Sequence, residues 1–191
     1  MTERSLRRVG TTSMTLFAFV WAVAGTGAYP ALRPVILGAA VLIAVLILAP
    51  TWFLRRRDDT LTRRLPSGWW RNFQIVGGVQ FAAIALVVFL AIWADAAPLI
   101  PSGVALVVGL HFLPLRSLFR DPIWLAPAAG LIVVAVTGAT LYFVSGPAAG
   151  IVAATLGSAM VLFAVAALVA FLPAHPRVAA AQRVGRAGGG P

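Results

Sequence analysis

The sequence predicts an all-α integral membrane protein, a bundle of six transmembrane helices. Hydrophobic residues make up 61% of its 191 residues and charged residues only 10%, with a mean hydropathy of +0.96. A soluble domain carries about a quarter charged residues, so lipid is the expected solvent for most of this chain. Six apolar stretches follow one another with short connections, and the arginines between them fall almost entirely on one side of the membrane that they imply.

A helix needs about 20 apolar residues to cross the hydrocarbon core of a bilayer. This requirement predicts spans at residues 14–29, 35–54, 73–93, 98–115, 123–144 and 149–172. The first and fourth stretches are shorter than the others. The length allows one domain, so we expect a single transmembrane domain over residues 1–172 and a disordered, basic cytoplasmic tail at 173–191.

The charge pattern predicts the orientation. Every one of the fifteen basic residues is an arginine, and all except Arg33 lie before residue 14, in 55–72, in 116–122 or after residue 172. Cytoplasmic loops carry an excess of basic residues, so both termini are expected in the cytoplasm, with the protein in the inner (plasma) membrane. The exclusive use of arginine suggests GC-rich coding and a bacterial source.

The same arginines indicate the partners of the chain. They are distributed over all the cytoplasmic segments instead of being gathered into one groove or stripe. This distribution favours contacts with the anionic headgroups of the lipid bilayer and argues against nucleic acid, despite a net charge of +10.

The first span has an alternative interpretation. Arg7 and Arg8 precede an apolar run that ends in the small residues of 22–28, which also fits a cleaved signal peptide. Cleavage would leave five spans and the same arginine asymmetry. We favour a retained span, because the small residues also form a helix-packing face. Sequencing the mature N-terminus distinguishes the two.

Small residues predict where helices approach closely, because lipid tails are as apolar as leucine and give helices no hydrophobic reason to associate. The candidate close-packing positions are Gly77, Gly78, Gly109, Gly150, Ala154 and Ser158. Neighbouring helices of the same chain can use these faces, so internal packing is favoured over a homo-oligomer.

No Asp, Glu, Lys or Arg lies inside the six predicted spans, whereas ion-coupled transporters generally place such a group in the membrane. The sharpest polar cluster is His111 with Gln74 and Gln80. Counted by helical rise from Arg116, His111 lies about 7 Å deep, level with the glycine pair of the preceding span. We expect its imidazole to fit beside these glycines and to hydrogen-bond a glutamine or a backbone carbonyl. A structural role is favoured over proton handling or ligand contact.

Enzymatic chemistry has little support. Cysteine is absent, which removes thiolates and disulfides, and the two histidines fall short of the three or four ligands that zinc needs. No paired membrane-level carboxylates, nucleophile elbow or phosphate loop is visible. We therefore expect no metal, no cofactor and no catalytic residues.

Residues 109–115 read Gly-Leu-His-Phe-Leu-Pro-Leu and are followed by Arg-Ser-Leu-Phe-Arg. This stretch resembles a motif of a family of small bacterial multi-pass membrane proteins with no assigned activity. The resemblance implies a six-helix integral membrane protein and picks out His111, Phe112 and Pro114.

Two functional hypotheses follow. The first is a non-enzymatic membrane protein with a structural or partner-binding role. The alternative is a small permease or channel-like protein for a neutral or weakly polar solute, with His111, Gln74 and Gln80 near its inner mouth. A water-accessible cavity that reaches those three residues favours the alternative, and a closely packed interior favours the first.

Overall fold

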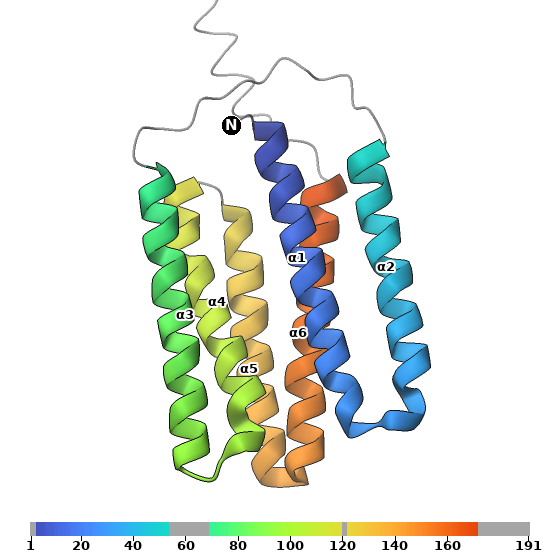
Figure 1. The fold of residues 1–191 in the computed structure, drawn as a ribbon, viewed down its shortest axis with the longest axis vertical. Helices are drawn as coiled ribbons and strands as arrows, with labels where there is room; N and C mark the ends of the chain where they lie inside the picture. The colour runs from blue at the N-terminus through green and yellow to red at the C-terminus, as the bar shows by residue number, and fades with distance from the viewer. Residues whose placement is uncertain (1–2, 54–68, 120–121, 172–191) are drawn as a thin grey trace, which may run out of the picture.

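The computed structural model describes residues 3–53, 69–119 and 122–171, which form six long helices joined by short 3-10 turns (Figure 1). The helices are α1 (Glu3–Gly25), α2 (Arg33–Phe53), α3 (Trp69–Trp93), α4 (Ile100–Phe119), α5 (Leu125–Ser145) and α6 (Pro147–Phe171). All six are long and apolar enough to cross a membrane, which confirms the predicted fold class. The predicted tail at 173–191 and most of the segment 55–72 lie outside the described residues.

The first helix begins much earlier than predicted. We expected a span from residue 14, because the residues before it are polar, but α1 begins at Glu3 and its membrane-crossing part is Arg8–Ala28. The reason is that Thr11, before the predicted start, is only 1% exposed and so belongs to the packed face of the helix, as does Thr15 within the predicted span. The fourth span also reaches crossing length, at Ala97–Ser117.

The helices pair as three antiparallel hairpins, and the α5–α6 hairpin lies between the other two (Figure 1). Helix α6 packs on α1, and α5 packs on α4. Helices α2 and α3 therefore lie at the two opposite edges of the bundle, although they follow each other in the sequence. The chain connecting them starts and ends at the same end of the bundle as the N-terminus.

Tight turns close the hairpins at the other end. Gly146 links α5 to α6 with a φ of 93°, a left-handed conformation that favours glycine, and its N–H donates to the carbonyl of Tyr142. Asp95 ends α3 with a φ of 53°, and the N–H of Ala96 donates back to the carbonyl of Ala91. This is a Schellman arrangement with an acidic residue at the usual glycine position.

The core runs through the middle of the bundle, from α1 through α6 and α5 to α4. Ala18, Leu131 and Ala166, one from each of α1, α5 and α6, are fully buried there. The edge helices are less buried than these four. In an apolar window of 18 residues, 11% of the residues of α2 are buried within the protein, and none of those of α3. The bundle therefore has a packed centre and two edges that face outwards.

Candidate functional site

His111 lies on α4, where this helix packs against the edge helix α3. Its ring is half-buried and within hydrogen-bonding reach of the backbone of Val76, whose carbonyl can accept from an imidazole N–H. The next residue, Phe112, is buried; its ring meets His111 edge-on at 6.0 Å and stacks on Trp124 at 5.9 Å. The predicted backbone-carbonyl partner is thus the one that the geometry offers, and the histidine links α3 to α4.

The two glutamines of the predicted cluster lie differently around α3. Gln80 is one helical turn from Val76, on the same side of the helix, and is partly buried. Gln74 is about 160° around the helix from Val76 by helical geometry, and it is exposed. The structure therefore does not gather His111, Gln74 and Gln80 into one polar site.

The close-packing prediction was wrong for the glycine pair of α3. A Cβ atom added at Gly77 or Gly78 would meet nothing within 4 Å, so no other helix of the chain approaches closely at either glycine. The approach of α3 to α4 occurs elsewhere, where a Cβ at Gly103 would lie 2.5 Å from the Val87 side chain. For the same reason, the imidazole of His111 does not fill a gap left by the glycines.

The other predicted positions lie at close contacts or are fully buried. A Cβ at Gly150 would lie 2.8 Å from the backbone oxygen of Gly138, and one at Gly138 would lie 2.8 Å from the Ala154 methyl group. A Cβ at Gly109 would meet the backbone oxygen of Ala128 at 3.2 Å. Ala154 is completely buried, as is the remaining predicted position, Ser158. These contacts join α4 to α5 and α5 to α6.

Sequence analysis recognised one packed face only in part, in the small residues of 22–28. On α1, Thr11, Thr15, Ala18, Ala22 and Gly25 are all buried and recur at steps of three or four residues. This is the spacing of one helical stripe, and a Cβ at Gly25 would collide with Thr155 and Leu156 of α6. The signal was present in the sequence, but the polar threonines concealed it.

Three buried hydroxyl groups among the described residues have no hydrogen-bond partner: those of Thr11, Thr15 and Ser158. By contrast, the hydroxyl of Thr155, equally buried, donates to the carbonyl of Ile151 at 2.7 Å. A buried polar group without a partner costs about 1–3 kcal/mol. These three groups therefore weaken the packed centre.

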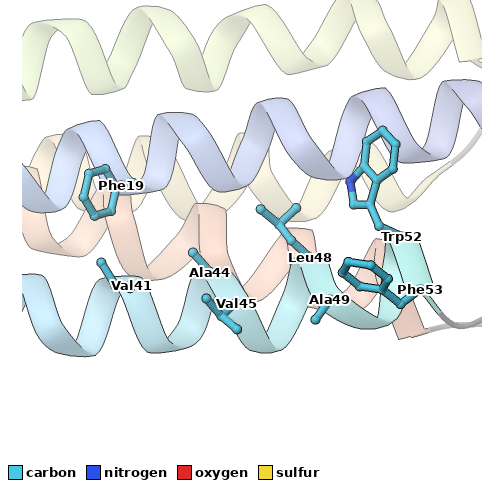
Figure 2. A pocket seen from close by; sticks show the side chains of 8 residues that line it. All are labelled: Phe19, Val41, Ala44, Val45, Leu48, Ala49, Trp52 and Phe53. Atoms are coloured by element: carbon cyan, nitrogen blue, oxygen red, sulfur yellow. The ribbon is translucent and has the colours of Figure 1, made fainter.

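An apolar groove runs along α2 where it faces α1, with a volume of about 510 Å³ (Figure 2). Seven lining residues come from α2, and the eighth, Phe19, comes from α1. The α2 residues are Val41, Ala44, Val45, Leu48, Ala49, Trp52 and Phe53. A second apolar groove, of about 340 Å³, adjoins it and shares Val45, Ala49 and Phe53. Neither groove is lined by His111, Gln74 or Gln80.

A cationic side chain lies at one end of the larger groove. The Arg8 guanidinium of α1 lies over the Trp52 ring, 5.4 Å from its centroid. The Trp52 indole N–H points to the hydroxyl of Thr12 at 3.4 Å, which ties the end of α2 to α1 a second time. Sequence analysis placed Arg8 in a cytoplasmic segment, but nothing in the spacing of Arg8 and Trp52 along the chain indicated that they pair.

Comparisons with protein families, with curated proteins and with solved structures found no match for this chain. The resemblance of residues 109–115 to a bacterial membrane-protein motif therefore stays a prediction. Within the described ranges, no three His, Cys, Asp or Glu side chains gather as metal ligands would.

Proposed function

We propose that this chain is a non-enzymatic protein of the bacterial inner membrane that binds another membrane protein, with α3 as the binding helix. Both termini lie in the cytoplasm in this proposal, which the distribution of the fifteen basic residues supports. The observation that carries the proposal is the exposure of α3, because no residue of its apolar window is fully buried against the rest of the protein.

The exposed face of α3 has the composition of a helix interface. Gln74, Gly78 and Ala82 are all exposed and follow one another at four-residue spacing, so they lie on one stripe. Small residues let a second helix approach closely within a bilayer, and a glutamine can hydrogen-bond across the contact. The open space around Gly78 would admit such a helix.

The packing of the centre favours this role over solute conduction. Small residues bring α4, α5 and α6 into direct backbone contact at Gly109, Gly138 and Gly150. The two grooves described above are apolar and lie along α2, and neither is lined by His111. In this proposal His111 is a structural residue that fixes the binding helix α3 to α4.

Site-specific photocrosslinking in living cells tests the proposal. A photoreactive amino acid replaces Gly78 on α3 or, as the matched control, Leu46 on the exposed face of α2. We expect a discrete protein adduct from position 78 and none from position 46, and the adduct's mass identifies the partner as a second copy or another protein. Protein adducts that are absent at position 78, or equal at both positions, would overturn the proposal.

A substitution provides the complementary measurement. Gly78→Leu should reduce co-purification of the partner at least several-fold, because the larger side chain blocks the approach of a helix. The chain's own fold should tolerate the change, since the added atoms enter open space. Undiminished co-purification with Gly78→Leu would show that the stripe is not the interface.

A further inference from the structure

We propose that the groove between α1 and α2 binds an anionic diacyl phospholipid, with one acyl chain along α2 and the phosphate beside Arg8. This inference rests on residues at the edge of the bundle opposite α3. It is therefore independent of the partner-binding role proposed above.

The length of the groove suits an acyl chain. Its lining runs along α2 from Val41 to Phe53, which corresponds to about 18 Å of helix. One leaflet contributes about half of the ~30 Å hydrocarbon core, so the groove extends over roughly one leaflet. Ala44 and Ala49 leave room in it, because their short side chains lie between larger ones (Figure 2).

The width of the groove argues against a protein helix as the occupant. A volume of about 510 Å³ spread over ~18 Å gives a mean cross-section of roughly 28 Å². A helix about 10 Å across has a cross-section of roughly 80 Å². The groove is therefore too narrow to enclose a helix, whereas a single hydrocarbon chain can lie along it. The adjoining groove, which shares Val45, Ala49 and Phe53, offers room for the second chain of the same lipid.

The charge at the end of the groove suits a phosphate. Arg8 is held over Trp52 at the end of α2, where a headgroup would sit if the chain lay along the helix. Asp95 is the one carboxylate whose side chain the structure describes, and it lies at the other end of the bundle. Stacking on an aromatic ring leaves the N–H donors of a guanidinium available, and these match phosphate oxygens.

Native mass spectrometry of the full chain tests the site. The protein is purified from an equimolar mixture of phosphatidylglycerol and phosphatidylcholine, and the lipid that remains bound is identified. We expect retained phosphatidylglycerol in the wild type and its loss in Ala49→Phe, which fills both grooves. The matched control is Ala82→Phe on the exposed face of α3, which should retain the lipid as the wild type does.

The headgroup contact is tested separately. Arg8→Gln should lower the ratio of bound phosphatidylglycerol to phosphatidylcholine about five-fold, the equivalent of the ~1 kcal/mol that one basic residue contributes near anionic lipid. The wild type should carry phosphatidylglycerol in preference to phosphatidylcholine. Equal retention of the two lipids by the wild type would overturn the proposal, as would an unchanged ratio in Arg8→Gln.

A measurement on the wild type covers the case in which Ala49→Phe fails to fold. Phosphatidylglycerol with a photoactivatable group in its acyl chain is crosslinked to the protein, and the labelled peptides are mapped. Labels concentrated on residues 41–53 and near Phe19 would support the site. Labels spread equally over α2 and α3, or a protein found in the groove, would overturn it.

Discussion

Glycine serves opposite purposes in the central hairpin and in the edge helix α3. Gly138 and Gly150 bring α5 and α6 so close that a Cβ at Gly150 would lie 2.8 Å from a backbone oxygen, whereas Gly77 and Gly78 have nothing within 4 Å. Both regions are strongly apolar and both present small residues at helical spacing. The difference shows that in a membrane protein the same residue type can lie at a close contact between two helices or on a helix face that no other helix of the chain covers.

The largest loss of stability is expected at the close contact between α5 and α6. Gly150→Ala should destabilise the protein by about 2–3 kcal/mol, because the new methyl group would collide with backbone, which cannot give way as a side chain can. Thermal unfolding of the purified protein in detergent measures the loss. Gly78→Ala is the matched control. Equal melting temperatures for the two variants would contradict the proposed difference between the glycines of the α5–α6 contact and those of α3.

A smaller loss of stability is expected where the edge helix α3 packs on α4. His111→Ala should lower stability by about 1 kcal/mol, since it removes the donor near the Val76 carbonyl and the edge-on contact with Phe112. Leu113→Ala, at an exposed neighbour on the same helix, controls for the loss of apolar atoms. A melting temperature equal to that of the wild type would argue against a structural role for His111.

The centre also offers a substitution that should increase stability. Thr15→Val replaces a buried hydroxyl that has no partner with a methyl group, and should stabilise the protein by roughly 0.5–1 kcal/mol. Thr155→Val should give no such gain, because the hydroxyl it removes is hydrogen-bonded to Ile151. Chemical unfolding of the two variants compares them, and a destabilised Thr15→Val protein would indicate that its hydroxyl has an unseen partner.

The smallest change in stability is expected on the exposed face of α3. Gly78→Leu should change stability by no more than about 0.5 kcal/mol, although it adds four carbon atoms, because these enter open space. The thermal unfolding assay used for Gly150→Ala applies here too. A loss comparable to that of Gly150→Ala would mean that α3 packs against another part of the chain.

Hydropathy and charge were sufficient to predict the class of fold and the number of helices, because lipid imposes a length and a composition on every span. The start of α1 could not be predicted in the same way. Thr11 is a polar residue before the predicted span, and only the packing of α1 on α6 shows that it belongs to the packed part of the helix.

The candidate site was predictable only in part. The position of His111 between α3 and α4 follows from the antiparallel hairpin, and helical rise alone gives its depth. The rotation of α3 about its own axis does not follow from the sequence, because nearly all its faces are apolar. For this reason Gln74, Gly77 and Gly78 were placed on the wrong side. The pairing of Arg8 with Trp52 likewise depends on tertiary structure.

The position of the last hairpin sets a constraint on biosynthesis. Among the described helices, α1 and α2 touch neither α3, α4 nor α5, and only α6 connects the two groups. While the ribosome is still translating α6, the nascent chain therefore consists of two separate units in the bilayer, one of two helices and one of three. Premature termination before Pro147 would leave these units unjoined, with the small-residue face of α1 open to membrane proteases and chaperones.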